Sequence, residues 1–312
     1  MALIDIHTHG IGGYDTRTTT EEHILRIAEI HGSSGVSAIV PAVYSATVRV
    51  MRENMAVVKK AMERQKASAG RQEEGIAPGR EGATGSALGT QASSCPPATI
   101  LGVHLEGPFL NPSYCGALNA MTFIDPTEYA LRELLEGFED IVRIITVAPE
   151  LENGVNIIRK ITDMGIVASM GHSGATYSEA AAGHRAGARG ITHLFNAMRG
   201  FHHREPGIAG FGLLTREVYT EIIADPHHLH SETLKLIFRN KDPERVLLVS
   251  DSVAETRTSP NGRAVTDDRG APIGGSMTVA ESAQRLMELG FGNATVARCM
   301  TENPLRYLER AA

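Results

Sequence analysis

The run from residue 100 to residue 108 reads ILGVHLEGP, and it shows the pattern that decides the fold. Its first residues are largely apolar, as in a strand that is buried on both faces of a sheet. The run then ends on an acid, Glu106, which is followed at once by the breakers Gly-Pro. Glu106 is therefore expected where a strand stops. A carboxylate there can be a helix cap, a surface charge or a metal ligand, and this run alone does not decide among them.

Seven other short apolar runs resemble this one, and amphipathic stretches separate most of them. Helices that alternate with continuously apolar strands predict a parallel sheet with both faces covered, and eight such units predict a single closed (β/α)8 TIM-type barrel over residues 1–312. The expected strands are 3–6, 36–40, 100–105, 141–147, 166–170, 190–192, 219–224 and 245–249. The expected helices are 20–31, 46–65, 126–135, 153–164, one from 177, 234–239, 278–289, 295–300 and 304–308.

The composition is that of a globular protein without special partners. The chain has 30 basic and 36 acidic residues, a formal charge of -6, and no basic block, which argues against binding to nucleic acid. No apolar run approaches the roughly 20 residues of a membrane span, and the N-terminus lacks the pattern of a signal peptide, so we expect a cytoplasmic protein. The three cysteines are widely spaced and fit neither a disulfide framework nor a zinc motif.

Residues 66–97 differ from the rest of the chain. They are rich in Gly, Ser, Ala, Glu and Arg and lack aliphatic periodicity, so we interpret them as a low-complexity insertion. Such a segment cannot bury enough apolar surface to offset its ordering entropy. We expect a surface loop without a chemical role.

Histidines and acids gather where the expected strands end. His7 and His9 are two residues apart, so their side chains leave an extended chain on the same side and can reach one ion, although a pair of satisfied polar side chains is the alternative. The carboxyl ends of the strands in a barrel form its active site. Seven ionisable residues converge there, which favours a metal site: His7, His9, Glu106, His172, His193, His228 and Asp251.

Four imidazoles and a carboxylate suit zinc, iron or another divalent first-row ion, with room for one or two ions per chain. Glu106 could bridge them, with His7 and His9 on one side and His172 and His193 on the other. Water bound near such an ion loses a proton close to neutral pH. Asp251 would then act as general base and later as general acid, while His228 could polarise the oxygen that develops charge. This describes hydrolysis of an amide or a similar acyl bond.

The motifs around these residues resemble the N-acetylglucosamine-6-phosphate deacetylase family of the amidohydrolase superfamily. The resemblance runs from residue 3 to about residue 308, and the motifs occur in the family's order. They are DIHTHG at 5–10, HLEGPF at 104–109, GHS at 171–173, THLFNAM at 192–198, HREPG at 203–207 and SD at 250–251.

The resemblance implies a role for each matching residue. Glu106, His172 and His193 would hold the principal ion, and His7 with His9 would supply a second site. Asn196 and Ala197 would contact the substrate and Arg204 its phosphate. His228 would bind the acetyl carbonyl, and Asp251 would exchange protons with the attacking water and the leaving amine. It also implies a homodimer acting on an amino-sugar phosphate, most simply N-acetyl-D-glucosamine 6-phosphate.

The chain departs from the family pattern in five places. It begins on the first barrel strand and ends near the last helix, so the family's small β-sandwich is expected to be absent. The 66–97 insertion is unusual, Pro226 stands where Gly is common, and Ser252 stands where Ala is common. His227 beside His228 makes the assignment of His228 less secure.

Three interpretations remain open. The first is a metal-dependent deacetylase of amino-sugar phosphates, and the second is an amidohydrolase acting on another acylated or cyclic amide. The third is a barrel that keeps its metal site without catalysis. Asp251 argues against the third because neither ion needs it as a ligand. Arg204 favours the first over the second, unless it forms a structural salt bridge to Glu205 or a nearby acid.

Overall fold

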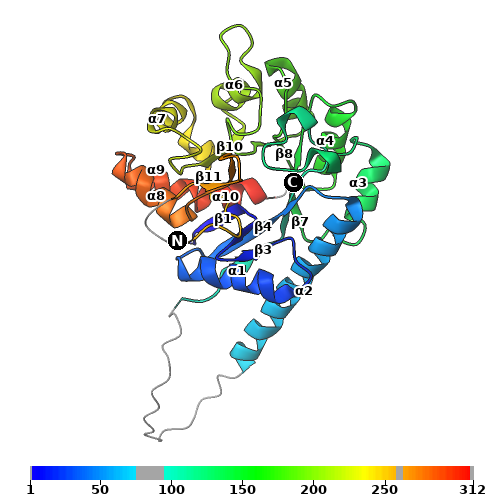
Figure 1. The fold of residues 1–312 in the computed structure, drawn as a ribbon, viewed down its shortest axis with the longest axis vertical. Helices are drawn as coiled ribbons and strands as arrows, with labels where there is room; N and C mark the ends of the chain where they lie inside the picture. The colour runs from blue at the N-terminus through cyan, green and yellow to red at the C-terminus, as the bar shows by residue number, and fades with distance from the viewer. Residues whose placement is uncertain (1, 75–94, 258–262, 310–312) are drawn as a thin grey trace, which may run out of the picture.

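The computed structural model describes residues 2–74, 95–257 and 263–309. Their longest sheet is entirely parallel and curls into a barrel around which the helices are arranged (Figure 1). The prediction of a TIM-type barrel is confirmed. Neighbouring strands in the sheet are β1 (Ile4–Thr8), β4 (Ala38–Tyr44), β6 (Val103–Glu106), β7 (Val142–Val147), β8 (Val167–Met170), β9 (Gly190–Ile191), β10 (Tyr219–Ile223) and β11 (Val246–Val249). A short β5 (Thr99–Ile100) precedes β6 and pairs with β4.

The barrel closes between its first and last strands. Thr8 forms a parallel bridge with Ser252, the backbone N–H of His9 donates to the carbonyl of Ser252 at 2.7 Å, and that of Asp251 donates to the carbonyl of His7 at 2.9 Å. These bonds lie just where β1 and β11 end. Closure therefore brings His7 and His9 beside Asp251, although more than 240 residues separate them in the chain.

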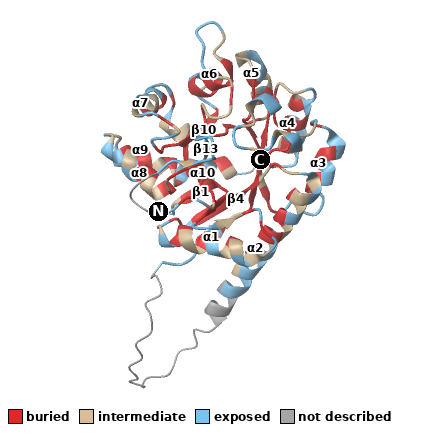
Figure 2. Cartoon of the chain, viewed as in Figure 1, coloured by how far each residue is buried: buried red, intermediate tan, exposed pale blue. Residues whose placement is uncertain are grey.

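Helices cover the outside of the barrel, and their buried faces turn inward in Figure 2. Side-chain caps begin several of them: Thr20 caps α1, and Thr176 and Thr278 form capping boxes with Glu179 and Glu281. No helix in the described ranges is long and apolar enough to cross a membrane. The helices are α1 (Glu21–Ser33), α2 (Val48–Glu74), α3 (Glu128–Leu135), α4 (Gly154–Asp163), α5 (Tyr177–Arg185), α6 (Gly207–Leu214), α7 (Ser231–Asn240), α8 (Val279–Glu288), α9 (Asn293–Cys299) and α10 (Glu302–Leu308).

Short strands and 3-10 turns lie in the segments that connect the barrel strands and helices. Two small antiparallel sheets pair β2 (Gly10–Ile11) with β3 (Tyr14–Asp15) and β12 (Val265–Thr266) with β13 (Pro272–Gly274). Single 3-10 turns form η1 (Pro112–Tyr114), η2 (Ala120–Thr122) and η3 (Pro243–Arg245). The β12–β13 hairpin follows the eighth strand, so it lies near the end of the barrel at which the histidines gather.

The barrel interior is partly polar. His104 Nε2 lies 2.8 Å from Thr146 Oγ1, which lies 2.9 Å from Thr192 Oγ1, and the Thr192 hydroxyl donates to Ser169 Oγ at 2.7 Å. All four side chains are completely buried. Buried polar groups are tolerated when they form hydrogen bonds with one another, and such a network holds these side chains rigidly inside the barrel.

The structure corrects the expected loop at residues 66–97. Helix α2 continues to Glu74, so the prediction was wrong for residues 66–74, while residues 75–94 lie outside the described ranges. Lys66, Ala67 and Ser68 are exposed, and in Figure 1 this end of α2 runs away from the barrel. Ala, Lys, Arg, Gln and Glu favour helix without any apolar face. A helix that packs against nothing needs no apolar periodicity. The lack of apolar periodicity in this segment was therefore wrongly interpreted as the lack of a helix.

A second correction concerns residues 207–214, which were expected to continue a loop into the seventh strand. They form α6, whose residues Gly207 to Leu213 are all buried. Three glycines and apolar residues on every side gave no amphipathic signal. The helix forms because it is packed on all sides, and the bonding of its Gly212 carbonyl to Lys241 Nζ at 2.9 Å shows how closely the neighbours approach.

Candidate metal centre

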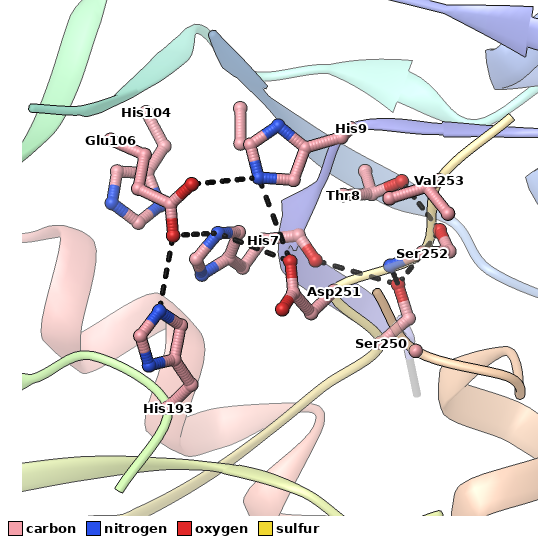
Figure 3. A network of polar contacts seen from close by, with 12 residues as sticks. His7, Thr8, His9, His104, Glu106, His193, Ser250, Asp251, Ser252 and Val253 are labelled. Atoms are coloured by element: carbon pink, nitrogen blue, oxygen red, sulfur yellow. Dashed lines mark hydrogen bonds and ion pairs between the residues drawn. The ribbon is translucent and has the colours of Figure 1, made fainter. Parts of the chain in front are cut away.

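Glu106 sits at the end of β6 at the centre of a ring of histidines (Figure 3). Its Oε1 lies 3.0 Å from His172 Nε2 and 3.1 Å from His193 Nε2, and these two nitrogens are 3.1 Å apart. Tetrahedral zinc with bonds of about 2.0–2.1 Å places its ligand atoms roughly 3.3 Å from one another. Three mutually close donor atoms on buried side chains therefore fit a divalent ion.

The tautomer of His172 supports this assignment. Its Nδ1 lies 3.0 Å from the carbonyl of Tyr114, which can only accept, so Nδ1 carries the proton. The Nε2 lone pair then points at Glu106 and at His193. Metal-ligating histidines commonly donate their second nitrogen in this way.

A second group of donors shares Glu106. Its Oε2 lies 3.1 Å from His9 Nε2, and its Oε1 lies 3.5 Å from His7 Nε2. Asp251 Oδ1 lies 3.5 Å from His7 Nε2 and 3.6 Å from His9 Nε2. The ligand atoms of His7, His9 and Asp251 all lie within 4.8 Å of one another, as do those of Glu106, His172 and His193. Glu106 could thus bridge two ions.

Three of these residues hold backbone conformations that favour glycine. His172, His193 and Asp251 follow their strands with φ of 47°, 30° and 48°. For residues with a Cβ this region costs about 1–3 kcal/mol when the surroundings impose it. Such strain is typical of sites where a side chain must be aimed, and here all three side chains are aimed at one point.

The electrostatics keep Glu106 ionised. Burial raises its pKa, but the neighbouring imidazoles in their protonated forms, His172 first among them, lower it more, and the pKa lies well below its usual range. Burial lowers the pKa of His193 and of His7, yet neighbouring carboxylates, chiefly Glu106 for His193 and Asp251 for His7, raise both above the usual value. The site therefore attracts positive charge, whether protons or a metal ion.

His228 lines the same cavity as Glu106. Its Nδ1 is 2.9 Å from Asp225 Oδ2, so Nδ1 carries the proton and Nε2 is left to face a ligand. Asp225 also accepts the backbone N–H of Ser276 at 2.8 Å. Burial raises the pKa of Asp225, but His228 and these hydrogen bonds lower it below the usual value. His228, and not His227, lines the cavity.

A buried chain of hydroxyls lies beside Asp251, on the residues that flank it and on β1 (Figure 3). Ser250 Oγ donates to Asp5 Oδ2 at 2.5 Å and lies 3.0 Å from Ser252 Oγ. Ser252 Oγ is 2.8 Å from Thr8 Oγ1, which is 3.1 Å from His31 Nε2. Ser252, where the family often has Ala, thus ties the residues flanking Asp251 to β1 and α1.

The cavity has a volume of about 340 Å³, and its lining includes Asn196 and Ala197 together with the candidate ligands His9, Glu106, His172 and His193. Arg204 does not line it. Its loop is exposed, and no ion pair joins Arg204 to Glu205, whose carboxylate instead accepts the backbone N–H groups of Tyr177 and Gly207. Among the described residues, no Lys or Arg lines the cavity.

The comparisons with known proteins agree with this geometry. No family model matches the chain. An N-acetylgalactosamine-6-phosphate deacetylase of Escherichia coli O157:H7 is 27% identical over 321 residues, which are 98% of this chain and 77% of the relative. An N-acetylglucosamine-6-phosphate deacetylase of Bacillus subtilis is 33% identical over 234 residues, which are 70% of this chain and 58% of the relative.

Solved structures extend the likeness over nearly the whole chain. N-acetyl-D-glucosamine-6-phosphate deacetylase of Mycobacterium smegmatis, as a mutant in complex with N-acetyl-D-glucosamine-6-phosphate, has a TM-score of 0.79 at 26% identity and covers 98% of this chain and 77% of its own. The Thermotoga maritima N-acetylglucosamine-6-phosphate deacetylase has a TM-score of 0.76 at 26% identity, with 98% and 78% covered. The chain belongs to the N-acetylglucosamine-6-phosphate deacetylase family.

Within this family fold, the candidate ligands named from the sequence lie close together, but sequence reasoning missed the residues that contact and orient them. Tyr44 stacks on His9 with ring centroids 3.8 Å apart, and Asp225 holds His228. Glu221, whose Oε2 lies 3.0 Å from His7 Nδ1, gave a signal that went unused, because a single acid stood inside the apolar run of β10. No comparable signal marked Tyr44.

Proposed function

We propose that this protein hydrolyses the N-acetyl group of an amino-sugar phosphate, most simply N-acetyl-D-glucosamine 6-phosphate, giving the free amine and acetate. The observation that supports this proposal best is the convergence of Glu106, His172 and His193 on one point, with Asp251 at the rim of the same cavity. The names of the relatives and the sugar phosphate bound to the M. smegmatis mutant support the substrate class.

Glu106, His172 and His193 would hold the principal ion, and His7 and His9 with Glu106 a second one. Zinc and iron both suit imidazole and carboxylate ligands. A divalent ion held there supplies a Lewis acid that polarises the amide carbonyl and makes water a better nucleophile. The chain's own groups then position the substrate and move protons.

Asp251 is placed to carry the proton. The Asp251 side chain is 15% exposed, whereas that of His7 beside it is buried. Its carboxylate can therefore contact a substrate in the cavity as well as water bound near the ion. Its carboxylate would take a proton from the attacking water and give it to the nitrogen of the leaving amine. His228 Nε2, oriented by Asp225, would bind the acetyl carbonyl oxygen as negative charge develops there.

Recognition of the phosphate is assigned to Arg204. The guanidinium forms no ion pair among the described residues, so it is available for paired hydrogen bonds to a phosphate. It lies on an exposed loop outside the cavity, so that loop must approach a bound substrate, in the same chain or in a homodimer.

A second candidate is hydrolysis of another acylated small molecule without phosphate. It is favoured by the absence of Lys and Arg among the described residues that line the cavity. The relatives' names also differ between galactosamine and glucosamine, so the sugar itself is open.

The experiment is an acetate-release assay with purified protein, coupled to metal analysis of the same sample. The panel comprises N-acetylglucosamine and N-acetylgalactosamine, each with and without the 6-phosphate. We expect release from a 6-phosphate that is lost with a chelator and restored by zinc or iron. Equal rates with and without phosphate would favour the second candidate, and no release from any sugar would contradict the proposal.

A further inference from the structure

Glu221 is a buried carboxylate that the proposed mechanism does not use. It lies in the middle of β10 and is completely buried inside the barrel. Its Oε2 lies 3.0 Å from His7 Nδ1 and accepts the backbone N–H of His193 at 3.3 Å. Its Oε1 is buried without a hydrogen-bond partner among the described residues. A buried carboxylate with so few donors is unfavourable unless positive charge lies near it.

The contact with Glu221 determines which nitrogen of His7 carries a proton and which is left to face the second ion site. Carboxylate oxygens accept hydrogen bonds, so His7 Nδ1 carries a proton in this contact and Nε2 is the nitrogen left for an ion. His7 Nε2 is buried, has no hydrogen-bond partner within the part of the chain that the structure describes, and lies 3.5 Å from both Glu106 Oε1 and Asp251 Oδ1. His7 Nε2 is therefore a nitrogen that could bind a metal ion, and it lies close to two carboxylates.

We propose that Glu221 is a positioning residue that determines whether the second metal ion binds. It does so by holding His7 with Nε2 toward that ion and by supplying a negative charge behind it. The inference rests on the proposed function, which places an ion beside His7 and His9. No hydrogen bond or ion pair joins Glu221 to a side chain of the principal site, and its hydrogen bond there is to the backbone N–H of His193, so its effect is directed at the second ion.

Replacing the carboxylate by an amide separates the two sites. In Glu221→Gln the side-chain oxygen can still accept from His7, but the negative charge is lost. Substituting a residue that hydrogen-bonds to a metal ligand typically weakens binding of the metal ion 10- to 100-fold. The second ion is expected to bind that much more weakly, while the ion at Glu106, His172 and His193 is retained.

The test uses Zn²⁺ alone. Metal-stripped wild-type protein and the Glu221→Gln, Glu221→Asp and Glu205→Gln variants are titrated with Zn²⁺ against a chromophoric chelator, which yields the first and second binding constants without any activity measurement. Glu205→Gln is the control because Glu205 bonds only to backbone N–H groups away from the ligands. The melting temperature of each stripped protein reports whether the substitution disturbs the fold.

We expect wild type and Glu205→Gln to bind two ions, and Glu221→Gln to lose affinity for the second alone. Glu221→Asp keeps the charge on a shorter side chain, so its second constant should fall between the two, and it serves as the test if Glu221→Gln does not fold. Wild-type constants in either Glu221 variant would overturn the inference.

The outcomes also distinguish the inference from the proposed function. A wild-type protein that binds one ion overturns the role of Glu221 but leaves hydrolysis with a single ion intact, whereas one that binds no ion overturns both. A third ion lost in both Glu221→Gln and His104→Gln would mean that His7, His104 and Glu221, whose ligand atoms also lie close together, bind an ion of their own. That result too would replace the positioning role.

Discussion

His31 should make the protein less stable in mild acid. The side chain lies near the end of α1 and is completely buried, with Nε2 3.1 Å from Thr8 Oγ1 and no hydrogen-bond partner for Nδ1 among the residues that the structure describes. Burial lowers its pKa from 6.5 to about 4. The folded protein therefore binds a proton at His31 less readily than the unfolded chain does. The stability is fully present above pH 6.5 and is lost as the pH falls toward 4.

The size of the effect follows from the two pKa values. Between pH 7 and pH 5 the unfolded histidine becomes almost fully protonated while the folded one stays neutral, which costs about 2 kcal/mol of unfolding free energy. His31→Gln keeps a hydrogen-bonding group opposite Thr8 but cannot titrate. Its unfolding free energy should fall by about 2 kcal/mol less than that of the wild type over this pH range.

The assay is urea denaturation of both proteins at pH 7 and pH 5, in chelator, so that metal release does not contribute. Subtracting the two pH dependences cancels every titrating group that the proteins share. His23→Gln, at a half-buried position on the same helix, reports what replacing a histidine does on its own. If wild type and His31→Gln lose stability in parallel, His31 is protonated in the folded state and the reasoning fails.

Three further predictions concern activity. Asp251→Asn should lower kcat by roughly 10²–10⁴ while metal content stays near that of the wild type, and full turnover would move the proton transfer to another residue. Arg204→Ala should reduce kcat/KM about 10- to 150-fold for a 6-phosphorylated sugar and barely change it for the same sugar without phosphate, since hydrogen bonds to charged groups contribute about 1.5–3 kcal/mol. Equal losses for both sugars would refute the phosphate role. Replacing residues 69–94 with a Gly/Ser linker should preserve soluble, active protein, because Gln65, which bonds to Ala98 and Ile100, remains. Insoluble protein would mean that the segment packs against the barrel.

The barrel was predictable because its signal is local. Each strand is a short apolar run that stops at a polar residue, and the observed strands β7 (Val142–Val147) and β10 (Tyr219–Ile223) differ from expectation by one residue at an end. The two misses have a common cause. Residues 66–68 at the start of the α2 extension are exposed, and α6 is buried from Gly207 to Leu213, so neither shows the two-faced pattern by which helices are recognised.

The residues of the candidate site also fall into two groups, those that could be predicted from the sequence and those that could not. His172 and His193 could be placed because each directly follows a strand, and parallel strands bring their carboxyl ends together. Glu221 could not be paired with His7, because 214 residues separate them and only closure of the barrel brings them together. The sequence shows what ends a strand, but the orientation of a ligand depends on which interior side chains meet, and that is decided by tertiary packing.

The most direct test of the account is Glu106→Gln, analysed for bound metal and for acetate release from N-acetyl-D-glucosamine 6-phosphate in the same preparation. Glu106 touches four histidines and is the carboxylate common to both proposed ion sites. We expect wild-type protein to hold one or two divalent ions per chain and to release acetate, and Glu106→Gln to lose most of both while remaining folded. A variant that keeps wild-type metal content and turnover would contradict the claim that this cluster is the metal centre that performs the hydrolysis.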